Sequence, residues 1–175
     1  MTTITQEIRI NAPKGKVWAI LADLGAVQRF HPGVKKSYYS TTQKEGVGAS
    51  RVCELLPMGE VLETASAWQE GEYMKIDIVE GKKMPPFKQA YASFRLREEH
   101  GQTVVKLALN YGLKFGPIGR LMDAVMVRSQ FKKVVPSMLA GLKHYAETGE
   151  EVNPTVLKAV RTPLATATQL QLSVN

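Results

Sequence analysis

Two oppositely charged residues, Arg51 and Glu63, are candidates for chemistry because each alternates with apolar side chains. Arg51 lies two positions before Cys53 in one predicted strand, and Glu63 lies two positions after Val61 in the next. Successive side chains of a strand point to opposite faces, so both charges are expected on the apolar face. A buried charge needs a partner or water, which predicts either a structural ion pair or an anchor for a ligand carboxylate or enolate. Both roles can hold at once.

His31 is the third candidate, in the segment Phe30-His31-Pro32-Gly33. An imidazole titrates near neutral pH and can accept or donate a proton, so His31 could act in acid–base chemistry if it faces a cavity. Its alternative role is to satisfy a carbonyl within its own loop. Arg51, Glu63 and His31 are therefore the candidate catalytic residues.

Several reaction classes lack their sequence motifs. The chain has no HExxH, paired CxxC, GxSxG, P-loop or GxGxxG pattern, so we expect no metal site and no cofactor. Nucleic-acid binding is not expected either, because the basic residues are not interleaved with aromatic residues on one recognisable surface.

Composition indicates one globular domain that needs no disulfide. The chain has 175 residues, of which 44% are hydrophobic and 22% charged, and its formal net charge is +7. Cys53 is the single cysteine, which favours a reducing compartment. The sequence has neither a secretory leader nor an apolar run of about 18 residues. We therefore expect a cytoplasmic protein that is not integral to a membrane.

The hydrophobic period changes from two to 3.6 near residue 116. A first strand over 3–10 is followed by a short helix ending near Asp23 and a helical turn over 26–30. After Gly116-Pro117, one amphipathic helix of roughly thirty residues is predicted to end at Gly149. Between these parts, alternating runs separated by turn residues predict six strands, over residues 34–41, 50–56, 60–69, 72–79, 87–98 and 103–114.

This order of elements predicts an α+β architecture. Short turns join antiparallel neighbours, so the six consecutive strands form a meander. A sheet with one apolar face needs a cover, and only the final helix is long enough to provide it. Residues 1–148 would form the domain, and residues 149–175 a C-terminal tail that is disordered or lies on the domain or on a partner.

The sequence resembles the START-like superfamily, also called the SRPBCC or helix-grip superfamily, and within it the bacterial polyketide cyclase/dehydrase and lipid-transport proteins. The resemblance covers about residues 4–148 and implies a seven-stranded antiparallel sheet wrapped around a long C-terminal helix, with two short helices after the first strand. It is carried by Ile10-Asn11-Ala12-Pro13 with Val17-Trp18, Phe30-His31-Pro32-Gly33-Val34, Gly46-Val47-Gly48-Ala49-Ser50-Arg51, Glu63 after Gly59, Trp68-Gln69-Glu70-Gly71, and Gly116-Pro117 with Gly141-Leu142-Lys143.

The resemblance also implies a deep cavity between the sheet and the long helix. By analogy with the plant abscisic acid receptors of this superfamily, some polar and aromatic positions would lie on its wall, and apolar positions on the buried faces would complete it. The expected ligand-binding residues are His31, Arg51, Cys53, Glu63, Ile76, Phe87, Gln89, Tyr91, Leu107, Leu109, Met122, Met126 and Ser129.

Three functions are compatible with this interpretation. The first is binding of a small hydrophobic or aromatic ligand, lipid-like or polyketide-like, with Arg51, Glu63 and His31 orienting its polar end. The second is a cofactor-independent cyclase or dehydratase, in which Arg51 stabilises an enolate and His31 or Glu63 moves the proton. The third is a partner-binding module that uses the cavity loops or the tail. A homodimer is left open by the sequence.

Overall fold

The computed structural model describes residues 1–56, 59–81 and 83–153. It confirms the predicted order of strand, short helices, six strands and long C-terminal helix. The elements are β1 (Thr2–Ile10), α1 (Lys14–Ala22), η1 (Leu24–Arg29), β2 (Val34–Tyr39), β3 (Ser50–Leu55), β4 (Gly59–Gln69), β5 (Tyr73–Gly81), β6 (Phe87–Glu99), β7 (Gln102–Leu113), α2 (Gly116–Met122), η2 (Asp123–Val127) and α3 (Arg128–Thr148).

The seven strands form one antiparallel sheet in the order β1-β7-β6-β5-β4-β3-β2. Strands β2 to β7 are neighbours in chain order, which confirms the meander, and β1 joins the far edge by pairing with β7. The β3–β4 register places Arg51 directly opposite Glu63. This register therefore brings the two charged side chains together on one face.

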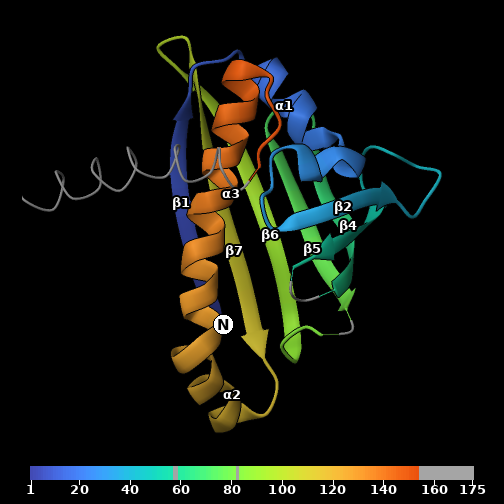
Figure 1. Cartoon of the computed structure of the whole chain (residues 1–175), viewed down its shortest axis with the longest axis vertical. Helices are drawn as coiled ribbons and strands as arrows, with labels where there is room; N and C mark the ends of the chain where they lie inside the picture. The colour runs from blue at the N-terminus through green and yellow to red at the C-terminus, as the bar shows by residue number, and fades with distance from the viewer. Residues whose placement is uncertain (57–58, 82, 154–175) are drawn as a thin grey trace, which may run out of the picture.

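Helix α3 covers the buried face of the sheet, and α1 and η1 lie at one end of it (Figure 1). The core between them contains residues from every layer, such as Trp18, Ile76, Leu107 and Leu142. Close packing holds the helix at its C-terminal half, because a Cβ atom built on Gly141 would lie 2.1 Å from the carbonyl oxygen of Phe30. Only glycine fits at this contact, which fixes α3 against the segment after η1.

The N-terminal part of the long helix departs from regular α-helix. Residues Asp123–Val127 form a π-helical turn between α2 and α3. Asp123 is buried there, and its Oδ1 accepts a hydrogen bond from Tyr111 OH at 2.5 Å. Its Oδ2 accepts from Thr2 Oγ1 at 2.9 Å and from Arg128 Nη2 at 2.7 Å. A π turn holds one more residue than an α turn, so it changes which side chains face the sheet.

The long helix ends at Thr148, with Gly149 in the left-handed conformation at its C-cap (φ 79°). The backbone N–H of Val152 donates to the carbonyl of Arg29, at 2.9 Å. The rest of the predicted tail, residues 154–175, lies outside the described residues. Within the described part of the chain, no helix is long and apolar enough to cross a membrane.

Candidate functional site

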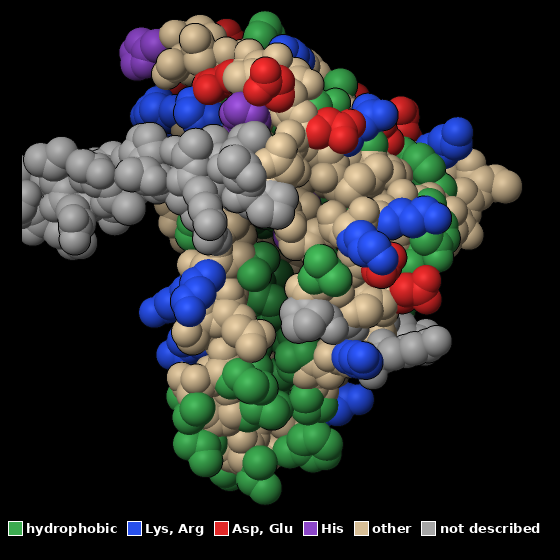
Figure 2. All heavy atoms as spheres, viewed as in Figure 1, with side chains coloured by type: hydrophobic (Ala, Val, Ile, Leu, Met, Phe, Trp, Pro, Cys, Tyr) green, Lys and Arg blue, Asp and Glu red, His purple; other side chains and the backbone are tan. Residues whose placement is uncertain are grey.

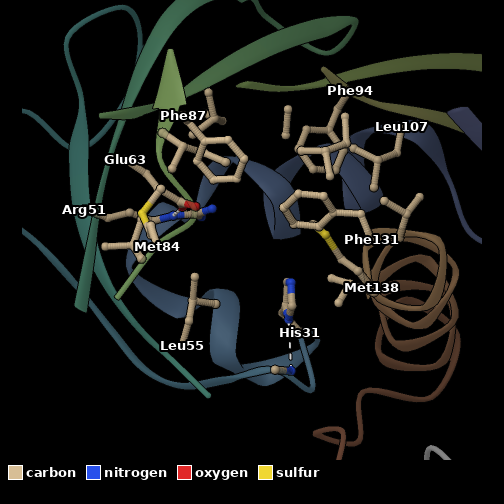
Figure 3. Close-up of a pocket in the computed structure, with 18 of the residues that line it drawn as sticks. His31, Arg51, Leu55, Glu63, Met84, Phe87, Phe94, Leu107, Phe131 and Met138 are labelled. Atoms are coloured by element: carbon tan, nitrogen blue, oxygen red, sulfur yellow. Dashed lines mark hydrogen bonds and ion pairs between the residues drawn. The ribbon is translucent and has the colours of Figure 1, made fainter. Parts of the chain in front are cut away.

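A cavity of about 130 Å³ lies between the sheet and α3. Figure 3 shows its arrangement: Arg51 and Glu63 lie on one side, Phe87, Phe94 and Leu107 on the sheet side, and Phe131 and Met138 on the helix side. His31 enters from the segment after η1. The wall is therefore apolar except where Arg51, Glu63 and His31 meet it.

Arg51 and Glu63 form a buried ion pair. Arg51 Nε donates to Glu63 Oε2 at 2.7 Å, and Arg51 Nη1 donates to the carbonyl of Leu24 at 3.3 Å. The two side chains are only 9% and 12% exposed. Burial is the largest single effect and opposes ionisation of Arg51, but the charge of Glu63, its hydrogen bond and smaller neighbouring effects together outweigh burial, so the pKa of Arg51 lies above its ordinary value. The opposite charges of this salt bridge offset each other.

His31 is held by its own loop. The backbone N–H of Gly33 donates to His31 Nδ1 at 3.0 Å, so Nδ1 acts as an acceptor. Burial lowers the pKa of His31 from 6.5 to about 4; by smaller amounts, the charge of Glu63 raises this pKa and the charge of Arg51 lowers it. The ring is therefore neutral near pH 7 and carries its proton on Nε2. Figure 3 shows the ring edge opposite Gly33 directed into the cavity.

Phe87, Phe94 and Phe131 contribute aromatic rings to the apolar wall. Phe87 stacks on Phe131 with centroids 6.1 Å apart, and Tyr111 lies edge-on to Phe87 at 5.8 Å. Met84 and Met138 lie on opposite sides of the cavity (Figure 3). Methionine side chains are unbranched and adaptable, so the cavity can change shape at these two positions.

Sequence comparison shows which family has this architecture. A family model described as polyketide cyclase/dehydrase and lipid transport matches residues 1–147. The chain belongs to this family. No curated protein matches the sequence at a significant level.

Solved structures share the family's fold at low identity. A protein from Thermus thermophilus superposes with a TM-score of 0.68 at 22% identity, covering 83% of this chain and 97% of that one. A Nitrosospira multiformis protein gives 0.67 at 19% identity, covering 85% and 98%. Ara h 8.0201 gives 0.64 at 14% identity, covering 83% and 97%. These likenesses confirm the helix-grip fold.

Seven of the predicted residues lie on the wall of the cavity in this family member. The polar ones are the three candidates identified first, and the apolar ones come from the buried faces of β5, β6 and β7. They are His31, Arg51, Glu63, Ile76, Phe87, Leu107 and Leu109.

The predicted placement of Gln89 and Tyr91 on the cavity wall is wrong because of a β-bulge. The β6–β7 register shifts between Phe87 and Gln89, so Phe87 faces inward but the next inward residues are Ala90 and Ala92. Gln89 instead lines a hollow outside the strand ends. Tyr91 packs on the other face of the sheet, with Lys75 Nζ 4.5 Å from its ring centroid.

Cys53 also does not line the cavity. It is buried behind the ion pair, with its Sγ 3.6 Å from Glu63 Oε2 and 3.5 Å from Ser37 Oγ. Burial raises the pKa of the thiol to about 11, and the nearby positive charge of Arg51 only partly offsets this effect. The thiol is therefore protonated and unreactive in the folded protein.

The prediction that Met122, Met126 and Ser129 line the cavity is wrong too. These residues form a regular helical series, but the π turn moves the inward face to Val127 and Phe131. Met122 packs at the edge of the core, Met126 is 47% exposed and Ser129 is exposed.

The helix residues that do line the cavity were missed from the sequence. Their spacing could have identified them, because counting back from Leu142 in steps of three and four residues reaches the helix positions that line the cavity. Other missed residues come from strand faces and from the loops at the opening. The missed lining residues are Gly33, Leu55, Leu56, Val61, Ile78, Met84, Ala92, Phe94, Phe131, Val134, Val135 and Met138.

Among the described residues, no group of three or more His, Cys, Asp or Glu side chains could hold a metal ion. The chemistry that the described cavity can offer thus comes from one ion pair, one neutral imidazole and aromatic surface.

Proposed function

We propose that the protein binds a small apolar or aromatic ligand that carries an uncharged hydrogen-bond acceptor, such as a ketone carbonyl. The observation that carries the proposal is the cavity itself, which is apolar except at the site of His31, Arg51 and Glu63. Apolar walls with a few convergent polar groups are typical of small-molecule sites. Membership of the polyketide cyclase/dehydrase and lipid transport family supports ligand binding in general terms.

The volume of the cavity limits the size of the ligand. At about 130 Å³ it is close to the roughly 150 Å³ of an engineered protein cavity that binds benzene. One aromatic ring with a short substituent fits without rearrangement. A longer ligand would have to displace lining side chains such as Met84 or Met138.

The charge of the polar wall favours a neutral acceptor over a carboxylate. Arg51 is already neutralised by Glu63, so an anionic ligand would add an unpaired charge to an apolar site. His31 presents Nε2–H to the cavity, and within the described residues no hydrogen bond from this group is present. A carbonyl oxygen would satisfy the donor without bringing charge.

The same geometry makes acid–base catalysis the weaker proposal. His31 Nδ1 already accepts the Gly33 N–H, and its Nε2 carries a proton, so the neutral ring offers no free base to a substrate. Glu63 is held by Arg51 at 2.7 Å. Binding therefore explains all three polar groups, whereas a cyclase reaction would have to break one of these contacts first.

The proposal can be tested with two ligands of the same shape. Acetophenone and α-methylstyrene differ in having a carbonyl oxygen or a methylene group at the same place, and each is titrated into the protein by calorimetry. We expect acetophenone to bind about two- to tenfold more tightly than the hydrocarbon, the range of one net hydrogen bond. His31→Phe should remove this preference while retaining hydrocarbon binding. If neither compound binds up to its solubility limit, the proposed function is wrong.

A further inference from the structure

We propose that the end of the molecule formed by α2, η2 and the loop before them docks on the surface of a lipid bilayer with anionic headgroups. This surface, called here the tip, consists of exposed apolar residues, and exposed basic residues lie in the same segment and in the adjoining part of α3. Figure 2 shows hydrophobic side chains gathered at this end, below the basic side chains along α3. The inference is independent of the ligand in the cavity.

The apolar residues of the tip are largely exposed and do not belong to the hydrophobic core. Phe115 is 65% exposed, Ile118 73%, Leu121 67%, Val125 73% and Met126 47%. Ile118 and Leu121 are three residues apart in α2 and share one face of it, and Val125 is exposed in the π turn that follows. A contiguous apolar face on a soluble protein marks an interaction surface.

The backbone supports the outward direction of this face. Phe115 has a φ of 69°, in the left-handed region that side chains with a Cβ rarely adopt, and its ring remains in solvent. The π turn directs Asp123 and Val127 inward, which leaves Val125 on the outside. The exposure of these apolar side chains therefore follows from the backbone conformation at Phe115 and in the π turn.

The charge around the tip is almost entirely positive. Between residues 114 and 133 the sequence has five Lys or Arg and one acidic residue, Asp123. Asp123 is buried and bonded to Tyr111, Thr2 and Arg128, so it offers no exposed negative charge. Exposed Lys114, Arg120 and Lys132 have no ion pair within the part of the chain that the structure describes.

An anionic bilayer matches both properties of the tip. A helix that lies in the membrane interface inserts apolar side chains while basic side chains contact acidic headgroups. A second copy of the chain would bring two positive surfaces together. A nucleic acid would match the charge but would offer no apolar layer for Ile118, Leu121 and Val125.

The test is co-sedimentation of the full chain with vesicles. Binding is compared between phosphatidylcholine vesicles containing about a third phosphatidylglycerol and vesicles of phosphatidylcholine alone. We expect binding to the anionic vesicles that weakens at about 0.5 M salt and little binding to the neutral ones. Leu121→Ser with Val125→Ser should weaken it at least tenfold, and Lys132→Gln about fivefold.

Matched controls carry the same substitutions elsewhere. Val47→Ser, at a residue 58% exposed in a loop of the β2–β3 connection, and Lys16→Gln, at an exposed residue of α1, should change binding less than twofold. Circular dichroism checks that the variants fold. Equal binding to both vesicle types, or equal loss in tip and control variants, would overturn the proposal. A dimer that Leu121→Ser with Val125→Ser dissociates, or duplex DNA binding that Lys132→Gln weakens without any vesicle binding, would assign the tip to a different partner.

Discussion

Breaking the Arg51–Glu63 pair from one side should be far more damaging than removing both charges. Glu63→Gln keeps the shape of the side chain but leaves the guanidinium of Arg51 in its buried position without a counter-charge. The double variant Arg51→Met with Glu63→Leu replaces the pair with apolar side chains of similar length. Comparing the two separates the energy of the pair from the desolvation of its members.

The magnitude follows from burial. With the side chains 9% and 12% exposed, the pair belongs to the buried class, in which loss of one partner costs about 3–5 kcal/mol. The adjoining cavity can admit water to Arg51, so we expect about 3 kcal/mol for Glu63→Gln. For a domain of this size, that loss lowers Tm by about 6–12 °C. The double variant should lie within about 1 kcal/mol of the parent or be more stable.

The assay is urea unfolding followed by the fluorescence of Trp18 and Trp68, which are both in packed positions. The control is Glu54→Gln, because Glu54 pairs with Lys35 at 3.0 Å with both side chains much more exposed, at 36% and 63%. An exposed pair contributes less than about 1 kcal/mol, so this variant should be close to the parent. If Glu63→Gln is no less stable than Glu54→Gln, or if the double variant loses as much stability as Glu63→Gln, the assignment of a buried ion pair is wrong.

Three further predictions use the same unfolding assay or a simple chemical probe. Burial lowers the pKa of His31 from 6.5 to about 4, so the unfolded chain binds more protons than the folded chain between these pH values. The free energy of unfolding should therefore fall by about 3 kcal/mol from pH 7 to pH 4. A His31→Phe variant whose free energy of unfolding depends on pH in the same way would contradict this prediction. Burial raises the pKa of Cys53 to about 11, so its reaction with a disulfide reagent at pH 8 should require unfolding, and rapid labelling of the native protein would be inconsistent with the structure. Gly141→Ala should destabilise the protein by about 1–3 kcal/mol because the added Cβ would meet the Phe30 carbonyl. Gly15→Ala, which has open space around it, should be neutral or stabilising by up to about 1 kcal/mol. Similar effects at both sites would argue against the close contact.

The elements and the ion pair could be predicted because they depend on local patterns. Arg51 and Glu63 each keep a period of two with apolar neighbours, and a short connection pairs their strands, so their meeting follows from alternation and an antiparallel register. The positions of Ile76, Leu107 and Leu109 follow from the same rule.

Five of the six misplaced residues lie where one residue is inserted into a regular pattern; the sixth, Cys53, lies on a regular strand and is buried beside the ion pair. A bulge between Phe87 and Gln89 reversed the faces of β6, and a π turn over Asp123–Val127 moved the inward face of the long helix by one position. The π turn contains Asp123, which bonds to Thr2 and Tyr111, residues distant in the sequence or in another element, so local spacing does not show it. The hydrogen-bonding state of His31 likewise depends on a loop conformation that residue types alone do not specify.

The most direct test of ligand binding is the methyl NMR spectrum of the protein during titration with acetophenone. The proposed function predicts that the methyl signals of Ile76, Leu107, Leu109 and Val135, which line the cavity, shift in a saturable way with one affinity. The signals of the exposed tip residues Ile118, Leu121 and Val125 should remain unchanged. Shifts confined to the tip residues, or no saturable shift in the cavity, would contradict the claim that this cavity is a ligand-binding site.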